Sequence, residues 1–160
     1  MPLTRERLVA HRTATASEAP HRHVWFFHVH AYFSAEQETE ARAFRDRIGA
    51  ELVPSGHVQL NGIIGRAVGP HPTGNFEVLF TRDAFADVAT WLQFNRPVWM
   101  SVLIHPCTES MELDHSDRAI WFGTPLPIDL KLPRMADERA RAENRDPVDV
   151  IDKDKAHRPT

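Results

Sequence analysis

The stretch HVWFFHVHAYF, residues 23–33, decides the expected fold because it is an apolar, aromatic run interrupted by histidines at alternate positions. Successive side chains of a β-strand point to opposite faces, so His28 and His30 should share one face of a strand. The other face then carries only apolar side chains, which we expect in the core: Trp25, Phe27, Val29, Ala31 and Phe33. Two imidazoles on one strand face indicate either a metal or acid–base site, or hydrogen-bonded structural histidines.

The residues that follow alternate between helical and strand periods. Residues 34–50 predict a helix, with Ser34 and Gln37 as a capping box and Gly49 as its end. We expect further elements as follows: a weak strand over 57–66, a turn over 69–74, a strand over 75–81, a helix over 83–96 and a strand over 98–106. This β-α-β-β-α-β order is typical of the ferredoxin-like α+β fold, an antiparallel sheet with helices on one face.

The other face of such a sheet must be covered by a partner, a ligand or water. We place the folded domain at residues 22–132, with an N-terminal tail over 1–21 and a charged C-terminal tail over 133–160. Within the second tail, a short helix is expected over 135–144, because the residue before Pro147 disfavours helix.

Strand alternation brings more polar side chains to the histidine face. It places Glu77 and His105 beside His28 and His30, while Phe76, Val78, Phe80, Val98, Met100, Val102 and Ile104 face the helices. Two histidines and a carboxylate are the ligands of a non-haem Fe(II) facial triad. Alternatively, Glu77 is a salt-bridged surface residue.

Two further histidines lie in loops that could reach this face. His71 lies in GPHP and His115 in LDHSDRAIWFG, and both are acid–base candidates because imidazole titrates near neutrality. The alternative interpretations are a rigid-turn residue for His71 and a local turn cap through Asp114 or Asp117 for His115.

Composition excludes several classes of protein. The 160 residues carry a net charge of −3, which provides no basic surface for nucleic acid. No apolar run approaches the roughly 20 residues of a membrane span. A single cysteine, Cys107, and an N-terminus without the apolar core of a signal peptide favour the cytoplasm. Ten histidines are the unusual feature.

Five motifs in order, HVHAYF, GPHPTGNFEV, VLIHPCT, LDHSDRAIWFG and PLPIDL, resemble the DOPA 4,5-dioxygenase family of fungal pigment enzymes and small bacterial relatives. The resemblance covers about residues 25–132. It implies extradiol cleavage of DOPA or a related catechol by Fe(II) and O₂, in a chain that forms a homodimer. Zn could replace iron in the isolated protein.

The resemblance also implies roles for individual residues. The family's histidines correspond to His28, His30, His71, His105 and His115. We expect three ligands from His28, His30, His105 and Glu77, with His71 and His115 as acid–base groups and with Tyr32 and Trp99 as walls for the substrate. Two alternatives stay open: a non-oxidative enzyme such as an isomerase or cyclase on the same face, and a non-catalytic dimeric binding module.

Overall fold

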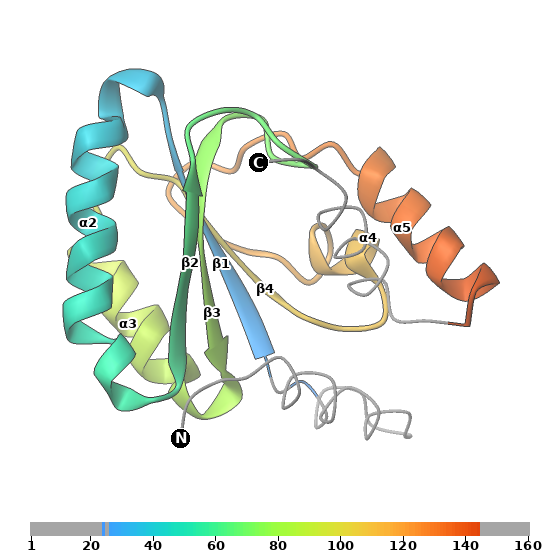
Figure 1. Cartoon of the computed structure of the whole chain (residues 1–160), viewed down its shortest axis with the longest axis horizontal. Helices are drawn as coiled ribbons and strands as arrows, with labels where there is room; N and C mark the ends of the chain where they lie inside the picture. The colour runs from blue at the N-terminus through green and yellow to red at the C-terminus, as the bar shows by residue number, and fades with distance from the viewer. Residues whose placement is uncertain (1–23, 25, 145–160) are drawn as a thin grey trace.

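The computed structural model describes residues 24 and 26–144, and within them the predicted ferredoxin-like α+β fold is confirmed (Figure 1). Its antiparallel sheet has the strand order β2-β3-β1-β4-β5. The strands are β1 (Phe26–Phe33), β2 (Val58–Ile64), β3 (Gly74–Thr81), β4 (Val102–Pro106) and β5 (Ile120–Phe122). The helices are α2 (Glu38–Glu51), α3 (Phe85–Asn95), α4 (Met111–Asp114) and α5 (Lys131–Ala142), with 3₁₀ turns η2 (Ala35–Gln37), η3 (Val53–Ser55) and η4 (Arg82–Ala84).

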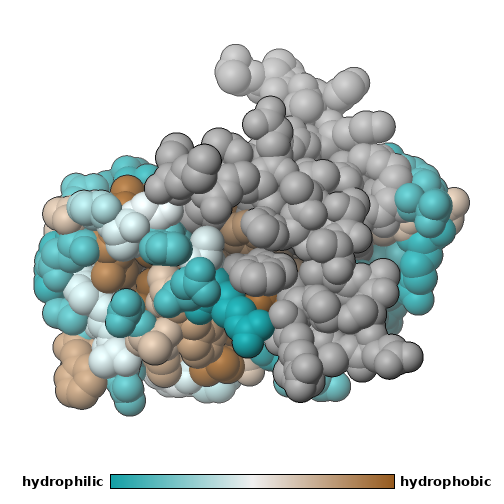
Figure 2. All heavy atoms as spheres, turned by 90° about the horizontal axis from the view of Figure 1, so that it is seen from below, coloured by the Kyte–Doolittle hydropathy of each residue, from teal (hydrophilic) through white to brown (hydrophobic). Residues whose placement is uncertain are grey.

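Helices α2 and α3 cover one face of the sheet and bury the main core against it (Figure 1). The apolar face predicted for β1 is in this core, since Val29, Ala31 and Phe33 are buried and Phe27 packs against them. Trp25 lies outside the described residues. From the helices, the core receives Ala41, Phe44, Ile48, Val88 and Leu92. The outer surface of α2 is polar, whereas that of α3 exposes Phe94, and Figure 2 shows hydrophilic side chains mixed with hydrophobic ones on this side.

The predicted capping box begins the first helical segment, and the Ser34 backbone N–H donates to Gln37 Oε1 at 2.9 Å. The helix does not end at Gly49, as the sequence suggested, but continues to Glu51. A Cβ at Gly49 would lie 3.4 Å from Leu60 Cδ2, an ordinary van der Waals contact, so the packing there does not require glycine. After α2 the chain turns at Gly56, whose φ of 76° is in the left-handed region that favours glycine.

The fourth strand is shorter than predicted, because residues 97–100 form a turn in which Met100 N–H donates to the Pro97 carbonyl. The Arg96 guanidinium donates to the carbonyls of Pro97, Val98 and Met100, which stabilises the turn. Strand alternation therefore fails at Val98 and Trp99, whereas Met100 is buried in the main core as predicted. Val98 is 94% exposed rather than in the core, and Trp99 packs against the main core rather than facing the histidines.

The second face of the sheet is covered by the chain's own residues. His30, Tyr32, Leu79 and Leu103 all point to this face and are buried in the single chain. Residues 107–119, which include α4, and then α5 lie on the side of the sheet opposite α2 and α3 (Figure 1). Part of the segment expected to be a tail is therefore a helix that packs on the domain, and it begins at Lys131 rather than 135.

No helix among the described residues is long and apolar enough to cross a membrane. The predicted tail over 1–21 lies outside the described residues, as do residues 145–160.

Candidate metal centre

The structure brings His28, His30 and His105 together on one face of the sheet, as strand alternation predicted. In the antiparallel register of β1 and β4, His28 is the Cα partner of His105, and His30 follows two residues later on the same face. One ligand nitrogen from each of the three imidazoles lies within 4.8 Å of the others. The Nε2 atoms of His30 and His105 are 3.1 Å apart. We call this group the strand triad.

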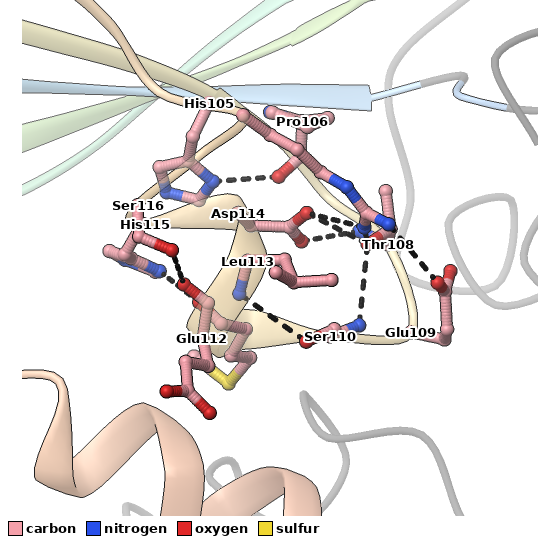
Figure 3. Close-up of polar contacts among 12 residues, drawn as sticks. His105, Pro106, Thr108, Glu109, Ser110, Glu112, Leu113, Asp114, His115 and Ser116 are labelled. Atoms are coloured by element: carbon pink, nitrogen blue, oxygen red, sulfur yellow. Dashed lines mark hydrogen bonds and ion pairs between the residues drawn. The ribbon is translucent and has the colours of Figure 1, made fainter.

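A backbone carbonyl fixes the tautomer of His105. Its Nδ1 lies 2.7 Å from the carbonyl oxygen of Pro106 (Figure 3), which can only accept. Nδ1 is therefore the protonated nitrogen, and Nε2 presents its lone pair to His30. Metal-bound histidines use this arrangement, in which the second ring nitrogen donates to a carbonyl or carboxylate.

His71 is placed by a tight turn. The backbones of Val68 and His71 exchange two hydrogen bonds of 3.2 and 3.0 Å, and Gly69 between them has φ 57°, a conformation that favours glycine. The GPHP sequence thus directs His71 to the histidine face, where its ring centroid is 4.0 Å from that of His30. Its Nδ1 lies 2.8 Å from the hydroxyl of the buried Tyr32.

His115 is the C-cap residue of α4, and its ring lies on the same histidine face of the sheet. Its ring centroid is 4.1 Å from that of His105. Its Nδ1 donates to the carbonyl of Met111 at 2.9 Å, so Nε2 carries the lone pair. His115 does not cap a turn through Asp114 or Asp117. With His30 and His71 it forms a second group of three histidines, whose ligand atoms also lie within 4.8 Å of one another.

Burial keeps several of these imidazoles neutral. The pKa values of His30 and His105 are well below the ordinary value, first because of desolvation and then because neighbouring histidines disfavour a positive charge. Desolvation also lowers the pKa of His115. Neutral imidazole is the form that binds metals and accepts protons.

Glu77 lies beside the triad rather than within it. Its carboxylate is 3.9 Å from Nδ1 of His30, its side chain is 27% exposed, and it belongs to neither group of candidate ligands. A facial triad of two histidines and this carboxylate is therefore not what the structure assembles. Asn75, which the sequence analysis missed, places Oδ1 3.5 Å from the same nitrogen of His30.

Tyr32 lies at the histidine cluster, but its aromatic neighbour is not the predicted one. Its ring stacks on Trp121 of β5, with centroids 5.7 Å apart and an interplanar angle of 22°. Trp99 is not brought to the site. Trp121 was within the quoted LDHSDRAIWFG motif, yet its short strand gave no period by which to predict its face.

The loop that carries His115 is fixed by a buried carboxylate. Asp114 accepts hydrogen bonds of 2.7 Å from both the backbone N–H and the hydroxyl of Thr108, and one of 3.2 Å from Arg118 (Figure 3). Burial raises the pKa of Asp114 to about 6, although these hydrogen bonds oppose the shift. The next residue after this anchored carboxylate is His115.

Comparisons with known proteins find one family model and several similar proteins. A model of the Dopa 4,5-dioxygenase family matches residues 27–132. An uncharacterised 21.2 kDa protein of Botryotinia fuckeliana is 37% identical over 127 residues, covering 72% of this chain and 67% of that protein. The DOPA 4,5-dioxygenase of Amanita muscaria is 34% identical over 125 residues, covering 71% of this chain. That match is only 51% of the fungal enzyme, so the chain spans about half of its length.

A solved structure is also similar. The crystal structure of a candidate dioxygenase from Nostoc punctiforme superposes with a TM-score of 0.65 at 32% identity, covering 70% of this chain and 93% of that one. Fold and site together define a ferredoxin-like α+β protein with a buried histidine cluster that could bind a metal ion. The chain belongs to the Dopa 4,5-dioxygenase family.

Proposed function

We propose that this protein is a non-haem iron extradiol dioxygenase that cleaves the ring of DOPA or a related catechol with O₂. The observation that carries the proposal is the pair of Nε2 atoms of His30 and His105, 3.1 Å apart in a buried site. Family membership supports the substrate class and the oxidant.

The donor set of the strand triad fits a divalent metal. The neighbours of His30 Nδ1 are the oxygens of Asn75 and Glu77, which favour a proton on that nitrogen. Nε2 of His30 then carries a lone pair that faces the lone pair of His105 Nε2. A shared cation removes this repulsion, and protonation of His30 is disfavoured by its lowered pKa.

In this assignment His28, His30 and His105 hold Fe(II), and three neutral ligands leave coordination positions for the substrate and O₂. The metal, when bound, would hold catechol oxygens and O₂ in one coordination sphere and lower the pKa of the bound hydroxyls. Zn²⁺ would suit the same imidazoles but has no redox chemistry. Glu77 acts on the outer side of His30, where its carboxylate favours a proton on Nδ1.

His115 is the best-placed proton acceptor. Its Nδ1–H is committed to the Met111 carbonyl, so Nε2 is the atom that would take the catechol proton and later return it. The lowered pKa keeps this nitrogen unprotonated at neutral pH. His71 is the second candidate, since the Tyr32 hydroxyl at 2.8 Å can exchange a proton with its Nδ1. The stacked rings of Tyr32 and Trp121 would form an aromatic wall that excludes water.

Dimerisation and location stay predictions. The homodimer was expected partly because one face of the sheet was thought to be uncovered, but residues on that face are buried within the single chain. That part of the reasoning therefore no longer holds. Sedimentation of the purified protein would determine the oligomeric state, and imaging of a tagged chain would test the cytoplasmic location.

The experiment that tests the proposal is O₂ uptake by protein loaded anaerobically with Fe(II). DOPA and simpler catechols are supplied, and the yellow absorbance of a ring-fission product is followed. Uptake together with the colour supports extradiol cleavage and ranks the substrates. Binding of catechol to iron-loaded protein without uptake contradicts the proposal and favours a binding module on the same site.

A further inference from the structure

Helix α5 lies almost entirely beyond residue 132, where the match to the family ends, yet it contacts the segment that carries His115. Asp137 on this helix is only 4% exposed. A buried carboxylate needs hydrogen-bond partners. The partners are at the start of α4. Asp137 accepts hydrogen bonds from Ser110 Oγ at 2.8 Å, Met111 N–H at 2.8 Å and Glu112 N–H at 3.1 Å.

Helix α4 depends on this carboxylate more than a long helix would. It has only four residues, and the first N–H groups of any helix have no partner within it. Asp137 supplies acceptors for two of these N–H groups and also holds the N-cap hydroxyl of Ser110. An ion pair between Arg134 and Glu112, with N and O 2.6 Å apart, joins the same two helices at the surface.

One peptide unit connects Asp137 to the histidine cluster. The peptide between Met111 and Glu112 donates its N–H to Asp137 and accepts at its carbonyl the Nδ1–H of His115, at 2.9 Å. Because hydrogen bonds in a chain polarise one another, the carboxylate strengthens the acceptor that holds His115. That acceptor fixes both the orientation of the ring and the tautomer with its lone pair on Nε2.

We propose that Asp137 is a positioning residue, which acts through the Met111–Glu112 peptide to hold His115 with Nε2 directed at the metal centre. The role of His115 as proton acceptor rests on the proposed function, whereas the positioning itself does not. This extends the functional unit beyond residues 27–132, which the family model matches, to include α5.

The test compares Asp137→Ala and Asp137→Asn with Glu138→Ala and Glu138→Gln. Glu138 is the next residue on α5 and is exposed, so its variants make the same change in charge without touching α4. Three quantities are measured: the tautomer of His115 by nitrogen NMR of the imidazoles, with His115→Gln for assignment, the iron content, and kcat and KM across pH.

We expect Asp137→Ala to keep iron, to lose the single His115 tautomer, and to lower kcat about 10- to 100-fold with KM changed less than about threefold. The pH profile should change, because the base is no longer in one tautomer. Asp137→Asn retains one acceptor and should lie between this variant and the wild type. The Glu138 variants should match the wild type.

An unchanged His115 tautomer together with an unchanged pH profile in a folded Asp137→Ala or Asp137→Asn variant overturns the proposal. If Asp137→Ala does not fold, the Asn variant supplies the answer. If the wild-type protein consumes no O₂ with any catechol, the proposed function fails, but the NMR comparison still decides whether Asp137 positions His115.

Discussion

Nε2 of His30 and Nε2 of His105 face each other at 3.1 Å across the β1–β4 strand pair, and the Pro106 carbonyl fixes the lone pair of His105 in this contact. Only a proton or a cation between the two nitrogens makes the contact favourable. Burial and neighbouring imidazoles lower the pKa of both rings, so an imidazolium is disfavoured there. The contact is then satisfied either by a neutral His30 that carries its proton on Nε2 or by a metal ion held between the two nitrogens.

His105→Ala should remove iron binding, because it deletes the ligand whose lone pair is held in place by the backbone. Loss of a partner outside the metal's own ligands already costs about 10- to 100-fold in affinity, and loss of a ligand should cost at least as much. Iron per chain, measured after anaerobic loading and gel filtration, is the readout. His57→Ala is the matched control, since the His57 side chain is exposed and its imidazole hydrogen-bonds to the Thr81 hydroxyl, away from the histidine cluster. Wild-type iron content in His105→Ala would exclude the strand triad.

His115→Ala should keep iron but lose turnover, because the strand triad does not include it. Removing a general acid–base group lowers the rate by about 10²- to 10⁴-fold. Single-turnover absorbance under O₂, together with iron content, measures both effects. Loss of iron along with activity would instead assign the metal to the second group, His30, His71 and His115.

Most of the fold could be predicted from the sequence because β1, β3, α2 and α3 have clear periods. The His28 and His30 pair was predicted for the same reason. His105 was also placed on the correct face, because it lies after the turn over 97–100, in the regular part of β4. Trp99 and Val98 were misplaced because hydrogen bonds from Arg96 stabilise a turn there, and strand alternation cannot reveal such a turn. Most of α5 lies within the helix predicted over 135–144, but its start at Lys131 and its packing on the domain were not predicted.

The contacts that organise the site could not be predicted because they join segments far apart in the sequence. Asp137 and Met111 are 26 residues apart, and Tyr32 and His71 are 39 apart. A buried aspartate in a charged segment looks like any surface residue until its partners are known. Glu77 was assigned to the metal from strand alternation alone, which fixes the face of a side chain but not its reach.

Tyr32→Phe should weaken both stability and catalysis, because it removes the hydroxyl that contacts His71 Nδ1 at 2.8 Å while leaving the ring on Trp121. Loss of a buried hydrogen bond costs about 1–3 kcal/mol. Urea denaturation measures the free energy of unfolding, and O₂ uptake measures the rate. Trp121→Phe is the complementary variant, which keeps the hydroxyl and changes the stacking. Equal stability of Tyr32→Phe and wild type would show that the hydroxyl contributes nothing there.

The metal-free protein should lose stability as the pH falls below about 6.5. The pKa values of His30 and His105 are lowered in the folded chain, whereas in the unfolded chain they lie near 6.5. Below pH 6.5 the unfolded state therefore binds more protons than the folded state, and the free energy of unfolding falls as the pH falls. Each such proton contributes a slope of about 1.4 kcal/mol per pH unit.

Urea denaturation at pH 7.5, 6.5 and 5.5 measures this slope, and His105→Asn should reduce it by about one proton while His57→Ala leaves it unchanged. Bound metal competes with protons for the same nitrogens, so loaded protein should resist acid until the metal is released. Burial raises the pKa of Asp114 to about 6, so this carboxyl takes up a proton in the folded state over the same range and offsets part of the slope. The comparison with His105→Asn therefore decides: equal slopes in wild type and His105→Asn would mean that these imidazoles become charged as readily inside the fold as outside it. In that case burial would not keep them neutral, and the argument for a metal between them would lose its electrostatic basis.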